Sequence, residues 1–433
     1  MIRSRSIEAA VDAALTNTLG RIVIAFSGGM DSTVLLHAVA ERVDDKSRVL
    51  ALHVNHGLSV HADEWQRHCE TVSIQLGVDY AHRRVSIGSD GGTEAAARKA
   101  RYGAFQEFLD PGDALWLAHH RDDQAETLLW KLMRGGGVAA LAGMPESRRL
   151  GAGHLRRPLL AVPRIEIAAW ANARALKWID DDSNVDARFD RNFIRHEVLP
   201  VLQAKWPDAA SRLQHAARRF ADEAVLVRAA LDRRLGEIGL DGARISAAVA
   251  GDPRALPLLR RWLESNGVAG VRERVLMEIV RQAGGASHDR LPQIRVAAAR
   301  TVRRFADHLY LVSQAPTRFE TGNWTLAEPL ATSVGLLVAE RGSGVGLRSD
   351  VAWVQVRPRS GGERLRPVRR DGSRTVKQLL HDAHIPPWLR EGYPLVYVDD
   401  ALAAVPGIAI DAAFAEDGDG VWKLGVRTDV AQA

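Results

Sequence analysis

The run RIVIAF at residues 21–26 limits the possible folds of this chain more than any other feature. It is apolar and rich in β-branched residues, which is typical of a strand buried on both faces of a sheet. The runs RVLALHV at 48–54 and DALWLAHH at 113–120 share this character, and helical patterns separate the three. Alternating strands and helices predict an α/β fold, with an open and mostly parallel sheet between layers of helices.

A glycine-rich turn, SGGMDS at residues 27–32, leads from the first predicted strand into a helix. Such a turn presents unpaired backbone N–H groups and the positive end of the helix dipole to an anion. Asp31 would repel a phosphate, so we expect a bridging Mg²⁺ beside it. The segment lacks both the lysine and the spacing of a Walker A loop. A tight strand-to-helix turn with a serine cap is the structural alternative.

Acidic residues and histidines gather in the segment AHHRDDQAET, after the third predicted strand. At the start of a helix, Asp122, Asp123 and Glu126 would crowd one side, where they could hold Mg²⁺ or a cationic amine. Helix capping by the same carboxylates is the structural alternative. A zinc site is not favoured, because the adjacent His119 and His120 would point to opposite faces of a strand.

The segment DDDSNVDARFDRNFIRHEVLP at 180–200 carries Arg188, Arg191 and Arg195 at spacings of three and four residues. If the segment is helical, the three arginines form a stripe able to bind phosphate or carboxylate groups. A polar loop that leads into a capped helix is the alternative.

Composition narrows the classes of protein to which the chain can belong. With 433 residues it is long enough for two or three domains, and its net charge of +5 and pI of about 9.5 favour a nucleic-acid partner. The single cysteine, Cys69, excludes an intramolecular disulfide and a cysteine-ligated iron–sulfur cluster within one chain. The sequence has no signal-peptide pattern and no long apolar run, so we expect a soluble, cytoplasmic protein.

Several of these segments together resemble one known family. The chain contains, in the order found in bacterial tRNA(Ile)-lysidine synthetases of the PP-loop ATP pyrophosphatase superfamily, the segments SGGMDS, HVNHGLS, EAAARKARY, AHHRDDQAET, RGGGVAALAGM, RRPLL and DDDSNVDARFDRNFIR. The later segment VKQLLHDAHIPPWLREGYPLVYVDDALAAVPGI resembles the accessory C-terminal domain of the longer members. The resemblance covers about residues 20–200 and 355–410.

The resemblance implies a two-step ligation. Enzymes of this family use ATP to adenylate the C2 carbonyl oxygen of the wobble cytidine in the CAU anticodon of an isoleucine tRNA. The ε-amine of free lysine then displaces AMP to give lysidine, which changes codon reading from AUG to AUA. ATP and Mg²⁺ are therefore the expected cofactors, and this tRNA and L-lysine are the expected partners, while a homodimer is left open.

The resemblance also implies roles for the residues at matching positions. The expected ATP-binding residues are Ser27, Gly28, Gly29, Met30, Asp31, Ser32, His53, Val54, Asn55 and His119. The expected catalytic carboxylates are Asp123, Asp31 and Glu126, with Mg²⁺ on Asp31 and Asp123. The residues expected to bind lysine or tRNA are Asp122, Arg98, Arg101, Arg134, Asn184, Arg191, Asn192 and Arg195. Which arginines contact ATP phosphates, the lysine carboxylate or the anticodon stem is left open.

A basic segment, RPRSGGERLRPVRRDGSRTVK at residues 357–377, carries eight lysines and arginines against two acidic residues. We predict that it binds the acceptor arm of the tRNA through phosphate contacts, and a solvated basic face is the alternative. The expected contact residues are Arg364, Arg366, Arg369, Arg370, Arg374 and Lys377.

We predict three domains and a connector. Residues 1–205 should form a PP-loop catalytic domain of the Rossmann type, like the adenine nucleotide alpha hydrolases, and residues 206–235 a helical connector. Residues 236–314 should form a mainly helical middle domain that binds substrate. Residues 315–433 should form a small α+β C-terminal domain that binds tRNA.

Three other functions fit parts of the sequence. A tRNA 2-thiolation enzyme of the same superfamily would carry sulfur on cysteines or an iron–sulfur cluster, which a lone Cys69 does not favour. A synthetase acting on a free metabolite would not need the basic C-terminal segment. A nucleotide-sensing RNA-binding protein without turnover would not need Asp31, Asp123 and Glu126 together.

The basic segment generates a first prediction. Replacing Arg364, Arg366, Arg369 and Arg370 together with glutamine should weaken tRNA binding and flatten its salt dependence, because fewer counterions are released. The affinity for ATP should not change. Titrations of tRNA across a salt series test this, and an unchanged RNA affinity would remove the segment from the interface.

Overall fold

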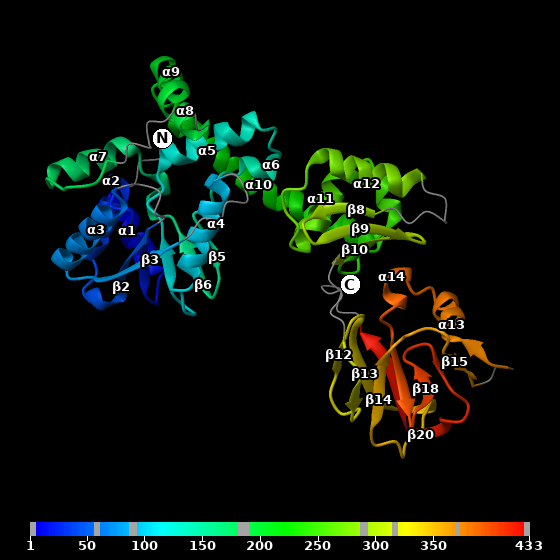
Figure 1. The fold of residues 1–433 in the computed structure, drawn as a ribbon. Helices are drawn as coiled ribbons and strands as arrows, with labels where there is room; N and C mark the ends of the chain where they lie inside the picture. The colour runs from blue at the N-terminus through cyan, green and yellow to red at the C-terminus, as the bar shows by residue number, and fades with distance from the viewer. Residues whose placement is uncertain are drawn as a thin grey trace. The chain divides into compact units, whose positions relative to one another are not determined.

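The computed structural model describes residues 6–55, 61–85, 93–180, 190–285, 293–313, 319–368 and 372–427. The chain divides into two compact units, residues 1–226 and 227–433 (Figure 1). None of the helices in the described ranges is both long and apolar enough to cross a membrane.

The first unit is built on a six-stranded sheet. Its strands are β1 (Ile22–Ala25), β2 (Val49–Asn55), β3 (Asp79–Arg84), β4 (Ala114–Trp116), β5 (Ser147–Leu150) and β6 (Gly153–Arg156), in the order β3-β2-β1-β4-β6-β5. All neighbouring strands run parallel except the edge strand β5, which pairs antiparallel with β6. The predicted N-terminal α/β fold with a mostly parallel sheet is confirmed.

Helices cover both faces of this sheet, as the apolar strands require. They are α1 (Ile7–Thr16), α2 (Met30–Ala40), α3 (Ala62–Leu76), α4 (Thr93–Gln106), α5 (Arg121–Met133), α6 (Val138–Leu141) and α7 (Arg164–Ala173). Ile22 and Ile24 enter one core with α1, α2, α3 and α7, whereas Val23 enters a second core with Phe105 of α4. This split follows from the two-residue period of a strand, and it explains why the first strand is apolar throughout.

The later part of the first unit is helical. It contains α8 (Asp190–Phe193), the π-helical turn η4 (Ile194–Val198), α9 (Leu199–Lys205) and the start of α10 (Ala209–Ile238). Ile194 and Leu199 pack with Ala125 of α5 and Ala210 of α10. This small core holds the arginine-bearing segment against α5.

The middle region in the second unit is not mainly helical, so that prediction is wrong. Two helices, α11 (Ala255–Ser265) and α12 (Glu273–Gly285), share a core with a four-stranded antiparallel sheet. The sheet has the order β7-β10-β9-β8 and consists of β7 (Arg244–Ser246), β8 (Gln293–Ala297), β9 (Arg300–Phe305) and β10 (His308–Ser313). β8 alternates regularly, with Ile294 and Val296 packed against the core, but its five residues are too few to stand out in a region rich in alanine and arginine.

The C-terminal region combines two short helices with three sheets. The helices are α13 (Val376–Asp382) and α14 (Pro387–Arg390). The strands are β11 (Gly322–Trp324), β12 (Leu330–Thr332), β13 (Gly335–Leu347), β14 (Val354–Pro358), β15 (Arg364–Leu365), β16 (Arg374–Thr375), β17 (Pro394–Val398), β18 (Ala401–Val405), β19 (Ala409–Ile410) and β20 (Ala415–Arg427). Their sheets have the orders β11-β14-β17-β18-β19, β12-β13-β20 and β15-β16, so strands dominate this region.

Candidate active site

The glycine-rich turn joins β1 to α2 and leaves the start of that helix open. Gly28 has a φ of +85°, a left-handed conformation that glycine adopts without strain. Gly29 is the N-cap of α2, and no side chain caps the helix. Ser27 Oγ lies 3.0 Å from Ser32 Oγ and accepts only a long hydrogen bond, 3.3 Å, from the Gly29 N–H. The turn therefore keeps the geometry of an anion-binding helix N-terminus.

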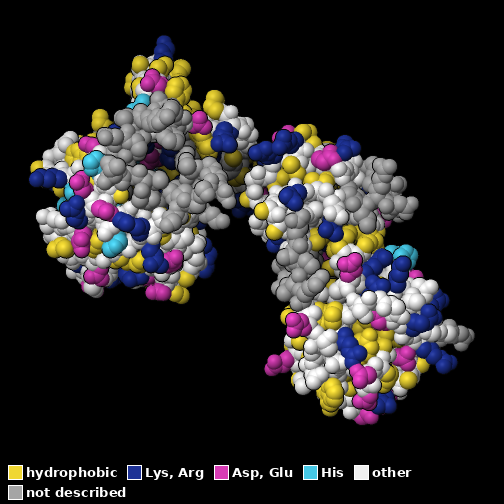
Figure 2. Space-filling view, in the orientation of Figure 1, with side chains coloured by type: hydrophobic (Ala, Val, Ile, Leu, Met, Phe, Trp, Pro, Cys, Tyr) yellow, Lys and Arg dark blue, Asp and Glu magenta, His cyan; other side chains and the backbone are white. Residues whose placement is uncertain are grey.

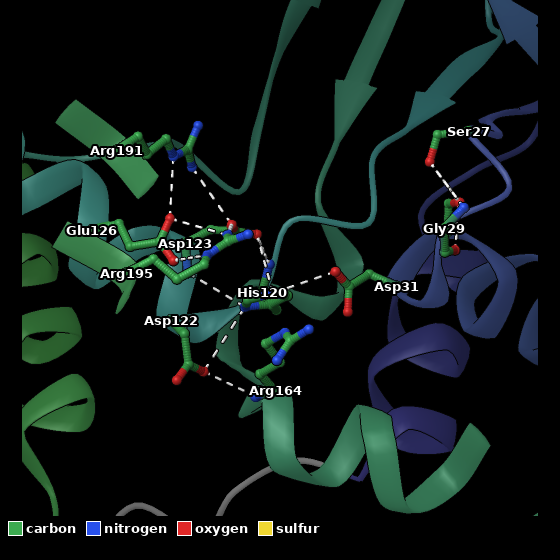
Figure 3. Close-up of polar contacts among 11 residues, drawn as sticks. Ser27, Gly29, Asp31, His120, Asp122, Asp123, Glu126, Arg164, Arg191 and Arg195 are labelled. Atoms are coloured by element: carbon green, nitrogen blue, oxygen red, sulfur yellow. Dashed lines mark hydrogen bonds and ion pairs between the residues drawn. The ribbon is translucent and has the colours of Figure 1, made fainter. Parts of the chain in front are cut away.

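The acidic segment at the start of α5 caps its own helix. His120 N–H donates to Asp123 Oδ2 over 2.9 Å, and Asp123 N–H donates to His120 Nδ1 over 3.3 Å, which together form a capping box. The fully buried His120 also brings its Nε2 to 3.5 Å from Asp31 Oδ2. Figure 3 shows His120 between Asp31 of α2 and the carboxylates of α5. Capping is thus one role of Asp123, and it fixes where the other carboxylate oxygen points.

Two arginines neutralise the buried carboxylates of α5. Arg195 donates from Nε to Glu126 Oε1 over 2.6 Å and from Nη2 to Asp123 Oδ1 over 2.9 Å. Arg191 donates from Nε to Glu126 Oε2 over 3.2 Å (Figure 3). Glu126 is only 1% exposed, so an unpaired charge there would be strongly destabilising. Burial raises the pKa of Asp123, but the neighbouring His120 and arginines outweigh it and lower this pKa to about 2.

The remaining two carboxylates have different surroundings. Asp122 Oδ2 accepts a 2.9 Å hydrogen bond from the Arg164 N–H at the start of α7, so it also caps a helix. Asp31 Oδ1 is buried and has no hydrogen-bond partner among the described residues. An orphaned carboxylate oxygen fits a cation ligand, and Mg²⁺ needs only one or two protein carboxylates beside phosphate and water. The described residues contain no group of three or more metal-ligating side chains. Asp31 therefore fits Mg²⁺, whereas the oxygens of Asp123 are already engaged.

These groups line one cleft of the first unit. Its volume is ≈ 990 Å³, and its lining includes Ser27, Gly29, Asp31, Glu126 and Arg195. A cleft of this size can accommodate a nucleotide together with a second small reactant. The elements meet here because β1 and β4 are parallel neighbours, so the turns that follow them lie at the same edge of the sheet.

Residues at the end of β2 are largely turned inward. His53 is 5% exposed, and its Nδ1 lies 3.0 Å from the Phe26 carbonyl oxygen. Asn55 is 2% exposed and donates a long hydrogen bond, 3.3 Å, to Gln66 Oε1. Val54 is packed against the core that also contains Val23. Of these residues, His53 supports the glycine-rich turn through its contact with the Phe26 carbonyl group.

The other predicted site residues lie in several places. Arg98 and Arg134 stack on the rings of Tyr102 and Trp130, with guanidinium carbons 5.0 and 4.6 Å from the ring centroids. Arg101 and Asn192 lie on α4 and α8 and have interaction partners. The predicted residues Asn184, Arg188, Arg369 and Arg370 lie outside the described residues.

Basic side chains of the C-terminal region are exposed. Lys and Arg side chains gather over β15 and α13 on the face seen in Figure 2. The exposed members of the predicted patch are Arg364, Arg366, Arg374 and Lys377. Arg364 donates to the Ser373 carbonyl oxygen over 3.0 Å, which ties together the two strands β15 and β16.

One buried arginine near the site was not predicted to have a role. Arg157, within the segment RRPLL, is 3% exposed and donates from Nε to His119 Nδ1 over 3.3 Å. Arginine is rarely buried, so the sequence carried no signal that this side chain would turn inward.

Three family models match the chain. A PP-loop domain matches residues 3–202, a TilS substrate binding domain matches 250–310, and a TilS substrate C-terminal domain matches 354–425. Among solved structures, the U34-tRNA thiolase NcsA from Methanococcus maripaludis aligns with a TM-score of 0.41 and 15% identity over 50% of this chain and 78% of that chain.

Curated relatives are similar over almost their whole length. The tRNA(Ile)-lysidine synthase of Coxiella burnetii is 36% identical over 407 residues, covering 92% of this chain and 90% of the relative. The enzyme of Methylococcus capsulatus is 41% identical, covering 89% and 90%, and that of Serratia proteamaculans is 37% identical, covering 96% and 98%. The resemblance noted in the sequence is confirmed, and the chain belongs to the tRNA(Ile)-lysidine synthase family.

Proposed function

We propose that this chain uses ATP to join L-lysine to C2 of the wobble cytidine in the CAU anticodon of an isoleucine tRNA. The products are lysidine, AMP and pyrophosphate, and the modified anticodon reads AUA in place of AUG. The proposal rests on one observation. An uncapped, glycine-rich helix N-terminus and the carboxylates Asp31, Asp122 and Glu126 line the same cleft. Family membership supports the same reaction.

The first step is adenylation of the cytidine. The cytidine C2 carbonyl oxygen attacks the α-phosphorus of ATP, and the bond to the β-phosphate breaks to release pyrophosphate. The backbone N–H groups at the start of α2 and the hydroxyl groups of Ser27 and Ser32 are placed to bind this departing diphosphate. Mg²⁺ on Asp31 would neutralise charge on the phosphates when bound.

The second step is attack by the lysine ε-amine. Asp123 and Glu126 already hold two guanidinium groups, so they form a site that selects cations, and a lysine ammonium can replace one guanidinium. With a pKa lowered to about 2, Asp123 is poorly matched to the role of general base near neutral pH. We therefore assign Asp123 to binding and orienting the lysine side chain, and not to removing its proton, which passes to solvent. The neutral amine then attacks C2, the C2–O bond to AMP breaks, and the second amine proton is released with AMP as the departing group.

The buried cysteine argues against a thiolation enzyme. Burial raises the pKa of the Cys69 thiol to about 12, and its side chain is 0% exposed. A thiol of this kind is not a nucleophile near neutral pH and cannot carry sulfur to a substrate.

We also propose that the exposed basic patch of the C-terminal region binds the acceptor arm of the tRNA.

A product assay tests the proposed function. The protein is incubated with CAU-anticodon isoleucine tRNA, ATP and isotope-labelled lysine, and the nucleosides are analysed by mass spectrometry. We expect the label in a modified cytidine, with one pyrophosphate released for each lysine incorporated. Pyrophosphate release without labelled nucleoside, or a sulfur-containing nucleoside, would contradict the proposal.

Asp123 should be essential to turnover. Replacing it with asparagine keeps an oxygen to accept from the His120 N–H but removes the charge that holds the amine. We expect lysidine formation to fall by about a hundredfold or more in a folded protein. The matched control is Asp190→Asn on α8, an exposed acid that accepts from Trp130 Nε1 and should retain activity. Near-normal turnover in Asp123→Asn would exclude the residue from the mechanism.

Gly28 and Gly29 offer a matched pair of substitutions on the nucleotide turn. At Gly28 an added Cβ would lie 2.6 Å from Ile179 Cδ1 and 3.0 Å from Cys69 Sγ, so Gly28→Ala should destabilise the fold. At Gly29 the nearest atom would be Ser27 Oγ at 3.5 Å, which is an ordinary contact. The protein itself therefore tolerates alanine at Gly29.

Gly29→Ala should separate folding from nucleotide binding. We expect its thermal melting temperature to match the unmodified protein, while its affinity for ATP falls by about tenfold or more, because the Cβ stands where a phosphate approaches the main chain. Calorimetric titration with ATP measures this. A Gly29→Ala protein that binds ATP normally would show that no phosphate contacts this turn.

A further inference from the structure

Arg157 is a buried cation without an acidic partner. Its side chain follows β6 and is 3% exposed, yet no Asp or Glu of the described ranges forms an ion pair with it. Burial lowers the pKa of Arg157. Tyr102 acts in the opposite direction, and the nearby Arg148 and Arg98 lower the pKa further. Burying an arginine that is not paired with a carboxylate costs free energy, so we expect specific contacts that offset this cost.

The contacts that Arg157 does make are to neutral acceptors. Its Nε–H donates to His119 Nδ1 over 3.3 Å, and Nη1 donates to the Pro145 carbonyl oxygen over 2.7 Å. A guanidinium group carries donors only, so His119 Nδ1 must hold a lone pair here. The proton of the neutral imidazole then lies on Nε2.

The sheet brings these two residues together. Trp116 of β4 pairs with Arg156 of β6, and the Leu117 N–H continues the ladder to the Arg156 carbonyl oxygen over 2.9 Å. Arg157 and His119 thus leave the carboxyl ends of neighbouring parallel strands, at the edge where ligands bind.

The neutral ring of His119 can donate a hydrogen bond from Nε2. Burial lowers its pKa to about 3, so the ring is neutral under ordinary conditions. Its side chain is partly exposed, and Arg157 occupies Nδ1, which leaves Nε2 as the nitrogen available to a ligand. A neutral N–H donor stabilises an oxygen that gains negative charge without carrying a charge of its own.

We propose that Arg157 is a positioning residue that holds His119 in the tautomer whose Nε2–H donates to an oxygen of the bound reactants. The acceptor is either an ATP phosphate oxygen or the former carbonyl oxygen of the cytidine, which gains negative charge as it leaves C2 with AMP in the second step. The identity of the acceptor rests on the proposed function, whereas the fixed tautomer does not.

The tautomer is tested by NMR on the full chain labelled with ¹⁵N-histidine. His119 signals are assigned by their loss in a His119→Gln protein, and two-bond ¹H–¹⁵N couplings identify the protonated nitrogen. We expect Nε2–H in the unmodified protein and a mixture of tautomers in Arg157→Met. The matched control is Arg156→Met, which removes the neighbouring arginine that donates to the Asn17 carbonyl oxygen and should leave His119 unchanged. An Nδ1–H tautomer, or no change in Arg157→Met, would overturn the proposal.

A second variant guards against a folding defect. Arg157→Gln offers an amide that can either donate to or accept from His119 Nδ1, so it should also allow both tautomers if Arg157→Met fails to fold. These spectra need neither tRNA nor turnover, so they test the tautomer independently of lysidine formation.

Titration and kinetics identify the acceptor. If Nε2–H donates to ATP, the Arg157→Gln protein should bind ATP about tenfold more weakly in calorimetry. If it donates to the cytidine, ATP affinity should hold while kcat falls about tenfold with KM for tRNA unchanged. Unchanged ATP affinity together with unchanged kcat would overturn the role of His119 as a donor.

Discussion

The pairing of two buried carboxylates with two arginines organises the catalytic cleft. Asp123 and Glu126 belong to α5, whereas Arg191 and Arg195 come from a segment more than sixty residues later in the chain. Neither half would tolerate burial alone, since a lone charge in a dry site destabilises the fold by several kcal/mol. The same pairing ties the helical segment after residue 190 to the sheet domain and closes one wall of the cleft. The amine substrate that we propose would therefore compete with a group of the protein that has equal charge.

The strand order explains how the proposed nucleotide and amine sites can share this cleft. From β1 the chain first adds β2 and β3 on one side and then returns to place β4 on the other. The turns after β1 and β4 consequently diverge and leave a crevice between them. The first turn contributes a helix N-terminus, which suits phosphate, and the second contributes carboxylates, which suit an ammonium group. Topology thus places groups that suit ligands of opposite charge on adjoining walls.

Much of the site could be predicted from short segments, because its chemistry follows directly after strands. The turn at Ser27 and the carboxylates near Asp123 are local patterns with local geometry. Long-range pairs were not predictable: nothing in the spacing of Arg195 reveals that it donates to Glu126 across 69 residues. The cap that Asp122 provides for α7 and the burial of Arg157 also depend on tertiary packing. In the middle region, the short strands β7 and β8 carry few apolar residues, so their pattern is weak beside the amphipathic helices α11 and α12. Pairing with β10 and β9 places them in the sheet.

Cys69 packs directly against the glycine-rich turn. Its sulfur is close enough to Gly28 that one added carbon on that glycine would touch it at 3.0 Å. A side chain larger than cysteine at position 69 would therefore push on Gly28 and shift the main chain at the start of α2. The shape of the turn thus depends on the size of a side chain more than forty residues away in the sequence.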